Sequence, residues 1–233
     1  MRWSSGSRAT DGAVDVNPAA ARELAYSLAP FVRDARVLTA IATVPRDRFV
    51  SPELRYRAYE NVALPIGDGQ TISQPLVVAR MLELLELSGS ERVLDIGTGS
   101  GYHAALLARL AAEVWSIERH PQLSELAREA LAELGVQNVE LSVGDGSHGL
   151  PSRAPFDAIN VAAAVEMPVP QPLLDQLAPG GRLVAPLRIG PDSPDSQRLA
   201  VIRKDDGVLR QVVLEAVRFV PLVTEPDPQR DRG

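Results

Sequence analysis

The stretch Glu91-Arg-Val-Leu-Asp-Ile-Gly-Thr-Gly-Ser-Gly-Tyr102 decides the fold of this 233-residue chain. It begins with a short apolar run, Val93 to Ile96, which only Asp95 interrupts, and it continues with glycine at every second position. Apolar residues with helical spacing then follow from Tyr102 to Leu110. A strand, a glycine turn and a helix in this order open a Rossmann-type unit. Glycine suits the turn because the backbone there takes angles that other residues avoid and approaches a ligand closely.

The spacing of the glycines indicates which ligand the turn binds. In the dinucleotide pattern G-x-G-x-x-G the third glycine would stand at Tyr102, whereas here Gly97, Gly99 and Gly101 give G-x-G-x-G. Asp95 would repel a pyrophosphate but not a ligand with an ammonium and a sulfonium. S-adenosylmethionine is such a ligand, and D-x-G-x-G-x-G resembles motif I of the class I methyltransferases. We expect Asp95 and the three glycines to bind this cofactor; the alternative is a turn that binds nothing.

The amino-acid composition excludes several kinds of functional site. Hydrophobic residues make up 45% of the chain, which is ordinary for a globular protein. Cysteine is absent, so disulfides, thiolate metal sites and cysteine nucleophiles are excluded. The net charge of −6 argues against a broad nucleic-acid surface. We recognise no secretory signal and no membrane span, so we expect a cytoplasmic protein without a membrane partner. The histidines lack metal-ligand spacing, so we expect no metal. Together with the net charge, the sequence also leads us to expect no nucleic-acid partner.

The chain is expected to form one domain. Residues 1–15 and 224–233 have the composition of flexible tails, and Gly190 to Ser196 that of a surface loop. Residues 16–223 are expected to form a single domain, in which 16–74 supply a helical cover and 75–223 the Rossmann-like core. We expect this domain to act as a monomer.

Apolar runs after the glycine turn predict the remaining strands. Glu118 ends the second strand, close to the ~20 residues at which an acid binds ribose hydroxyls in such folds. A third strand delivers Gly144-Asp-Gly146 to the same edge of the sheet, where Asp145 is either a ligand or only a turn residue. The predicted strands are 93–96, 114–118, 139–143, one within 154–164, 182–187, 197–204 and 208–220. They predict an α/β fold, a doubly wound and mostly parallel sheet with antiparallel C-terminal strands.

The first 90 residues read as helices and turns. Asn17 is expected to cap a helix from Pro18 to Phe31, and a second short helix ends before Pro45. The Arg-rich and aromatic segment from Pro45 to Tyr59 is expected to be a solvated, irregular cover, with a substrate-facing role as the alternative. A bend at Gly67 and Gly69 then leads to a helix from Pro75 to Leu87, with another helix at Leu173, Leu174 and Leu177. Ser73 precedes the Pro75 helix, either as its N-cap or as a catalytic residue.

Four segments together carry a family resemblance. Val44-Pro-Arg-Asp-Arg-Phe-Val50, Arg57-Ala-Tyr-Glu60, Leu64-Pro-Ile-Gly67 and Gly69-Gln-Thr-Ile-Ser-Gln-Pro75 resemble the protein-L-isoaspartate O-methyltransferase family. The resemblance covers roughly residues 20–223, and Thr-Ile-Ser-x-Pro ahead of motif I is the family's own signature. It implies a class I methyltransferase fold and S-adenosylmethionine as cofactor.

The resemblance also implies roles for particular residues. Ser73 matches the family's active-site serine, and Glu118 its ribose-binding acid. Asp145 with Gly146 matches the segment beside the adenine, while Gln70 and Thr71 are expected to line the cofactor site. Ala163 and Ala164 belong to a loop that shapes the substrate site. The chain departs from the family pattern at Asn160, Ala162 and Arg188, which leaves the acceptor-side rim open.

The activity implied by the resemblance is methyl esterification of the free carboxylate of L-isoaspartyl residues in damaged proteins and peptides. The ester would then cyclise to a succinimide, which hydrolyses partly to normal aspartate. One alternative is a tailoring methyltransferase that acts on an aspartate of a dedicated partner peptide. Others are a methyltransferase of small molecules or nucleic acid, a non-catalytic S-adenosylmethionine-binding module and a nicotinamide dehydrogenase, the last disfavoured by its glycine spacing.

Overall fold

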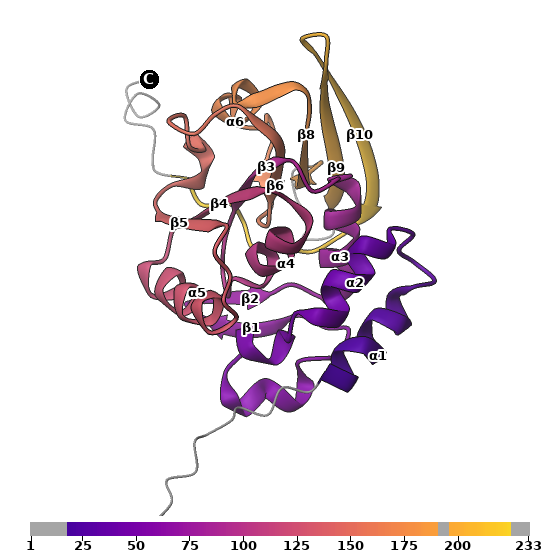
Figure 1. Cartoon of the computed structure of the whole chain (residues 1–233). Coiled ribbons are helices and arrows are strands. Elements are labelled where there is room, and N and C mark those ends of the chain that lie inside the picture. Colours follow the sequence, from indigo (N-terminus) through magenta and orange to yellow (C-terminus); the bar gives the residue numbers. More distant parts are fainter. Residues whose placement is uncertain (1–17, 191–195, 225–233) are drawn as a thin grey trace, which may run out of the picture.

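The computed structural model of the chain describes residues 18–190 and 196–224 (Figure 1). The expected tails, the Asn17 cap and most of the expected loop between Gly190 and Ser196 lie outside the described residues. Within them, no helix has both the length and the apolar character needed to cross a membrane.

A single large sheet forms the centre of the molecule, in the order β10-β9-β8-β6-β3-β4-β5 (Figure 1). Strands β5, β4, β3, β6 and β8 run parallel, while β9 is antiparallel to β8 and to β10. This confirms the predicted mostly parallel α/β sheet with antiparallel C-terminal strands. The strands are β3 Arg92–Ile96, β4 Glu113–Glu118, β5 Val139–Val143, β6 Phe156–Val161, β8 Leu177–Arg188, β9 Gln197–Asp205 and β10 Val208–Ala216, and the short β7 Val165–Glu166 pairs with β8.

The strand order places a switch point between β3 and β6. From β3 the chain moves outward to β4 and β5, and it then returns to add β6 and β8 on the other side. Ligands of open parallel sheets bind in the crevice outside the carboxyl ends of the strands at such a point. The glycine turn that follows β3 is therefore at the expected position for a binding site.

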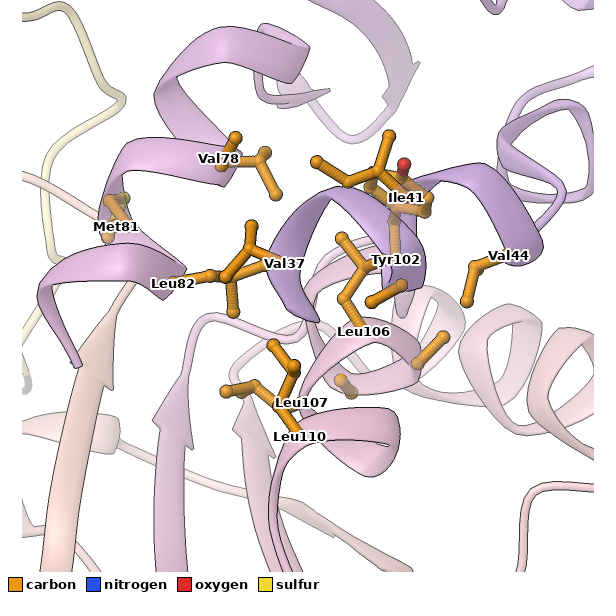
Figure 2. Packing of buried hydrophobic residues seen from close by; sticks show 14 of the residues in the cluster. Val37, Ile41, Val44, Val78, Met81, Leu82, Tyr102, Leu106, Leu107 and Leu110 are labelled. Atoms are coloured by element: carbon orange, nitrogen blue, oxygen red, sulfur yellow. The ribbon is translucent and has the colours of Figure 1, made fainter. Parts of the chain in front are cut away.

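Helices cover the sheet unequally. The α-helices are α1 Pro18–Leu28, α2 Ala35–Thr43, α3 Pro75–Leu84, α4 Tyr102–Leu110, α5 Pro121–Glu133 and α6 Gln171–Asp175, and the 3-10 helices are η1 Arg46–Phe49, η2 Pro52–Arg57 and η3 Gly146–His148. One core cluster joins α1 to α4 with one face of the sheet, and Figure 2 shows its side chains meeting between α2, α3 and α4. A second cluster on the other face includes Leu173 of α6. Alternate residues of β3 belong to different clusters, Val93 to the first and Leu94 to the second, as the two-residue period of a strand requires.

Several predicted ends of elements are wrong by a few residues. Helix α1 stops at Leu28 and not at Phe31, and α3 stops at Leu84 because Glu86 takes a left-handed conformation with φ of 46°. Leu177 begins strand β8 and does not continue the short helix α6. Strand β10 ends at Ala216 and not at Val220.

The segment before Ser73 is a hairpin and not a simple bend. Strands β1 Leu64–Gly67 and β2 Gln70–Ile72 pair antiparallel around Asp68 and Gly69. Both turn residues have positive φ, 49° and 71°, which is the requirement of the tight Asp-Gly turn that matches strand twist. The hairpin thereby fixes where Ser73 leaves β2.

The segment from Pro45 to Tyr59 agrees only in part with the expectation of a solvated, irregular cover, because η2 has no buried residue whereas most of η1 is buried. It forms the two 3-10 helices η1 and η2. Phe49 is 4% exposed and Arg46 is 0% exposed, which makes Arg46 the largest fully buried side chain. A buried arginine needs partners, and those of Arg46 lead to the site described below.

Candidate active site

Three adjoining hollows open at the carboxyl ends of β3, β4 and β6. We name them by a residue that lines only one of them: the Glu118 hollow, the His103 hollow and the Arg218 hollow. Thr71 and Ala162 line all three. Because they share these walls, the hollows form one continuous depression around the glycine turn.

The Glu118 hollow contains most of the residues expected to bind a cofactor. The sequence-predicted residues that line it are Gln70, Thr71, Gly97, Gly99, Glu118 and Gly146, together with Ala163, which was expected on the acceptor side. They come from β2, the glycine turn, the end of β4 and the segment after β5. The structure thus brings together residues that lie up to 93 positions apart in the chain, as the parallel sheet predicts.

The glycine turn is tightly held. Gly97, Gly99 and Gly101 all have positive φ, of 87°, 54° and 90°. The amide of Gly99 donates to Glu118 Oε2 at 2.8 Å, so β4 fixes the turn that follows β3. Gly101 lines none of the three hollows; a Cβ there would stand 3.2 Å from Ala127 Cα, so this glycine lets α4 approach α5.

Glu118 faces the first hollow with a buried carboxylate. The side chain belongs to a residue that is 5% exposed, and its Oε1 accepts a hydrogen bond from the amide of His120 at 2.9 Å. Each carboxylate oxygen can accept a further hydrogen bond. Glu118 can therefore bind hydroxyl groups of a ligand while it holds the turn.

Asp95 lies behind the turn and not in the wall of a hollow, contrary to the expectation of direct cofactor contact. It is 0% exposed; Ser116 Oγ donates to its Oδ2 and Asn160 Nδ2 to its Oδ1, both at 2.7 Å. Burial raises the pKa of Asp95, and these two hydrogen bonds act in the opposite direction. The departure at Asn160 thus has a structural reason, because its amide supplies a donor to a buried carboxyl group.

Asp145 and Ala164 also lie differently from the expectation. Asp145 Oδ1 accepts from the amide of Ser147 at 2.8 Å and caps η3, and only its neighbour Gly146 reaches the Glu118 hollow. Ala164 is 1% exposed and lines no hollow. Its backbone pairs with Val220 and Leu222, so it anchors the C-terminal segment.

Ser73 is positioned between the other two hollows. It lines both the His103 hollow and the Arg218 hollow and is half-buried. The N-cap of α3 is Gln74, so the alternative that Ser73 is merely a helix cap is wrong. Within the described part of the chain the Ser73 hydroxyl has no hydrogen-bond partner, which leaves it available to a ligand.

His103 was given no chemical role from the sequence, yet it lines the second hollow beside Tyr102 and Ser100. It is 6% exposed, and its Nε2 is buried without a hydrogen-bond partner. Burial lowers the pKa of His103 to about 4, so the imidazole is uncharged near neutral pH. An isolated histidine in a sequence carries no sign of such a location.

The C-terminal segment contributes walls that the sequence did not reveal. Val220 to Val223 line the Glu118 hollow, and 216–220 line the Arg218 hollow. The amide side chain of Gln197 holds this segment, because it accepts from the amide of Phe219 at 2.7 Å and donates to the Phe219 carbonyl at 3.1 Å. Arg218 is exposed and is the one charged residue among those that line its hollow.

Arg188, at which the chain departs from the family pattern, pairs with Glu166 and lines none of the hollows.

Carboxylate and histidine side chains do not gather into a metal site here. Across residues 18–190 and 196–224, no group of three or more such residues lies close enough together to hold a metal ion. The polar groups of the depression include instead the carboxylate of Glu118, the hydroxyl of Ser73 and the guanidinium of Arg218, which suit an organic ligand.

The fold and this depression define a class I methyltransferase. The family model described as Protein-L-isoaspartate(D-aspartate) O-methyltransferase matches residues 25–227, and the chain belongs to this family.

Named relatives agree with this membership. The chain is 53% identical over 192 residues to a protein-L-isoaspartate O-methyltransferase of Methanoculleus marisnigri, covering 82% of this chain and 85% of that protein. It is 49% identical over 207 residues to the protein of the same name from Vibrio atlanticus, covering 89% and 97%. A solved protein-L-isoaspartate O-methyltransferase structure matches with a TM-score of 0.79 at 31% identity, covering 87% of this chain and 66% of that one.

Proposed function

We propose that the protein transfers a methyl group from S-adenosylmethionine to the free carboxylate of L-isoaspartyl residues in proteins and peptides. The observation that carries the proposal is the continuity of the three hollows. Thr71 and Ala162 line all of them, so a ligand beside Glu118 and a ligand beside Ser73 would meet at the same wall. The family to which the chain belongs supports the choice of reaction.

The residues present fit the cofactor. Glu118 would accept hydrogen bonds from ribose hydroxyls, and Gly97 and Gly99 leave room for the ligand against the turn. Gly146 would lie beside the adenine, and no side chain fits at this position because a Cβ there would stand 2.4 Å from Ile96 Cγ2. Asp95 would attract the positively charged cofactor from behind the turn, because a nearby cation favours the ionised form of a buried carboxyl group. When bound, the cofactor supplies a methyl group that is already activated by a sulfonium.

The acceptor side suits an anion. A free carboxylate has a pKa near ~4 and is ionised at neutral pH, so it needs no general base. The hydroxyl of Ser73 would donate a hydrogen bond to it, and Arg218 provides positive charge on the same hollow. Because its pKa is lowered to about 4, His103 is a weak base, which agrees with a site in which no proton has to be removed.

The residues of the chain then have two main tasks, alignment and the exclusion of water. Correct positioning of two reactants can supply ~7–11 kcal/mol of a barrier. Ser73 would orient the acceptor oxygen, and Thr71 with Ala162 would line the path between the two ligands. The methyl ester so formed would leave the enzyme and cyclise to the succinimide, which begins the repair of the damaged residue.

The identity of the product tests this proposal. A synthetic isoaspartyl peptide would be incubated with the protein and S-adenosylmethionine, and mass spectrometry would locate the added methyl group. We expect an ester on the free carboxylate of the isoaspartate, which mild base releases as methanol. A methyl group that survives base, on nitrogen or sulfur, would overturn the proposal.

A further inference from the structure

Arg46 is buried in a way that the proposed reaction does not yet explain. It lies in η1, and its side chain is entirely inaccessible. Among the residues that the structure describes, no carboxylate is within ion-pair distance of its guanidinium, because the adjacent Asp47 accepts from the hydroxyl of Tyr59 instead. Burial lowers the pKa of Arg46 to about 10, so the side chain still carries its charge at neutral pH. A buried charge without a counter-ion is costly unless its donors are satisfied. Nε and Nη2 of Arg46 have partners, whereas its buried Nη1 has none among the described residues.

The partners of Arg46 are backbone carbonyl groups from three separate segments. Its Nε donates to the carbonyl of Ala58 at 2.8 Å, at the end of η2. Its Nη2 donates to the carbonyl of Ser73 at 2.9 Å and approaches that of Val62 at 3.4 Å. Hydrogen bonds from a charged donor are stronger than neutral ones, and the planar guanidinium fixes their directions. Arg46 therefore ties the backbone of Ser73 to the segment that precedes the β1–β2 hairpin.

The same guanidinium also touches the cofactor side of the site. Its central carbon lies 4.9 Å from the ring centroid of Tyr102, the first residue of α4, which directly follows Gly101. The ring of Tyr102 contacts that of Phe49, with the ring centroids 5.4 Å apart. Figure 2 shows Tyr102 within the first core cluster, close to Ile41. The planar guanidinium of Arg46 therefore contacts two parts of the site, the carbonyl of Ser73 and the helix that begins after the glycine turn.

We propose that Arg46 is a positioning residue for methyl transfer, which fixes Ser73 relative to the glycine turn. This inference rests on the proposed function, in which the Ser73 hydroxyl orients the acceptor carboxylate. Arg46 contacts the carbonyl of Ser73 and lines none of the three hollows, so it acts through Ser73 and not on a ligand. Its loss should move the hydroxyl and lower turnover, while the Glu118 hollow keeps its affinity for the cofactor.

Arg36 offers a matched control, because it also joins distant backbone segments. Its Nη1 donates to the carbonyl of Leu87, and its Nη2 donates to that of Leu110 at 3.3 Å. It lines none of the three hollows of the site. Arg36→Met should therefore reduce stability to urea without changing kcat or the Kd of S-adenosylmethionine.

A double-mutant cycle tests the proposal. The proteins are wild type, Arg46→Met, Ser73→Ala and the double variant, and kcat is measured with an isoaspartyl peptide at saturating cofactor, with the cofactor Kd from calorimetry. We expect Arg46→Met to lower kcat on the order of 10–100-fold, the scale of small misplacements, and to change the Kd by less than about twofold. In the Ser73→Ala background the same substitution should lower kcat by less than about threefold, since coupled residues are not additive.

The alternative outcomes separate the two proposals. An equal loss of kcat from Arg46→Met in both backgrounds, or a weakened cofactor with unchanged kcat, would overturn the positioning role and leave the reaction intact. No transfer by the wild type to the peptide would instead overturn the proposed function. If Arg46→Met does not fold, the cycle is run with Arg46→Lys, and the same two outcomes decide. Lysine keeps the charge, but its donors all sit on one nitrogen and cannot reproduce the separate positions of Nε and Nη2.

Discussion

The Ser73 hydroxyl is the residue-scale feature on which the reaction depends most. Ser73 lines the His103 hollow and the Arg218 hollow, and its hydroxyl has no hydrogen bond to any described residue. We predict that Ser73→Ala lowers kcat roughly 10–100-fold, because a hydrogen bond to a charged group contributes about 1.5–3 kcal/mol. Ser73→Thr retains a hydroxyl and serves as the matched variant. Weaker cofactor binding with unchanged turnover at saturating cofactor would show that Ser73 does not have this role.

Glu118 has two functions at once, which makes its substitution informative. Its carboxylate holds the amides of Gly99 and His120 and faces the first hollow. We predict that Glu118→Ala weakens the binding of S-adenosylmethionine by up to about 3 kcal/mol, since both a ligand contact and the support of the turn are lost. Titration calorimetry measures this directly. An unchanged dissociation constant would remove Glu118 from the site.

At the scale of elements, the junction between the glycine turn and α4 depends on close packing. A Cβ on Gly101 would stand 3.0 Å from Ala127 Cβ and 3.2 Å from its Cα, whereas one on Gly135, also at positive φ, would meet nothing within 4 Å. Gly135→Ala should therefore cost about 1 kcal/mol of unfolding free energy, from backbone conformation alone. We predict that Gly101→Ala costs clearly more and also weakens the cofactor, measured by urea denaturation and calorimetry. Equal costs for both variants would contradict this packing argument.

Most of the sheet could be predicted from the sequence, because its signals are local. The third strand was predicted with its observed ends, Val139 to Val143. The first helix turn of α4 was marked by the switch from glycines to helical spacing at Tyr102. The predicted ends of helices were less accurate, because a single residue in the left-handed conformation, such as Glu86, can end a helix.

The remaining features could not be predicted, because they depend on partners that are distant in the chain. Arg46 donates from Nε and Nη2 to carbonyl groups 12 to 27 positions away, and an arginine looks the same in a sequence whether it is buried or exposed. Asp95 was expected to face the ligand because the pattern gives its place on β3 but not the donors Ser116 and Asn160. Ala162 lines all three hollows and has no chemical group to mark it.

At the scale of the whole molecule, the buried Asp95 should shape the dependence of stability on pH. Its folded-state pKa is raised by burial, so the folded protein keeps the proton at pH values where the unfolded chain has released it. The free energy of unfolding contributed by this group therefore falls as pH rises from about 4 through the folded pKa, and it is recovered on acidification.

Asp95→Asn removes this ionisation while keeping the shape of the side chain. We predict that its free energy of unfolding, relative to that of the wild type, increases as pH rises from about 4 towards neutrality and is constant above the folded pKa. Urea denaturation at a series of pH values measures the difference. A difference that is the same at every pH would mean that the carboxyl group of Asp95 titrates normally in the fold.

The function of the whole molecule is tested most directly by methyl transfer from labelled S-adenosylmethionine to two synthetic peptides. The peptides are identical except that one carries isoaspartate and the other aspartate at a single position. We predict label in the isoaspartyl peptide alone, and a rate of labelling roughly 10–100-fold lower in Ser73→Ala. Label in the aspartyl peptide would contradict the proposed specificity for isoaspartate. Label in neither peptide, while the cofactor still binds in a calorimeter, would also contradict the proposed function and would point to a dedicated partner peptide as the acceptor.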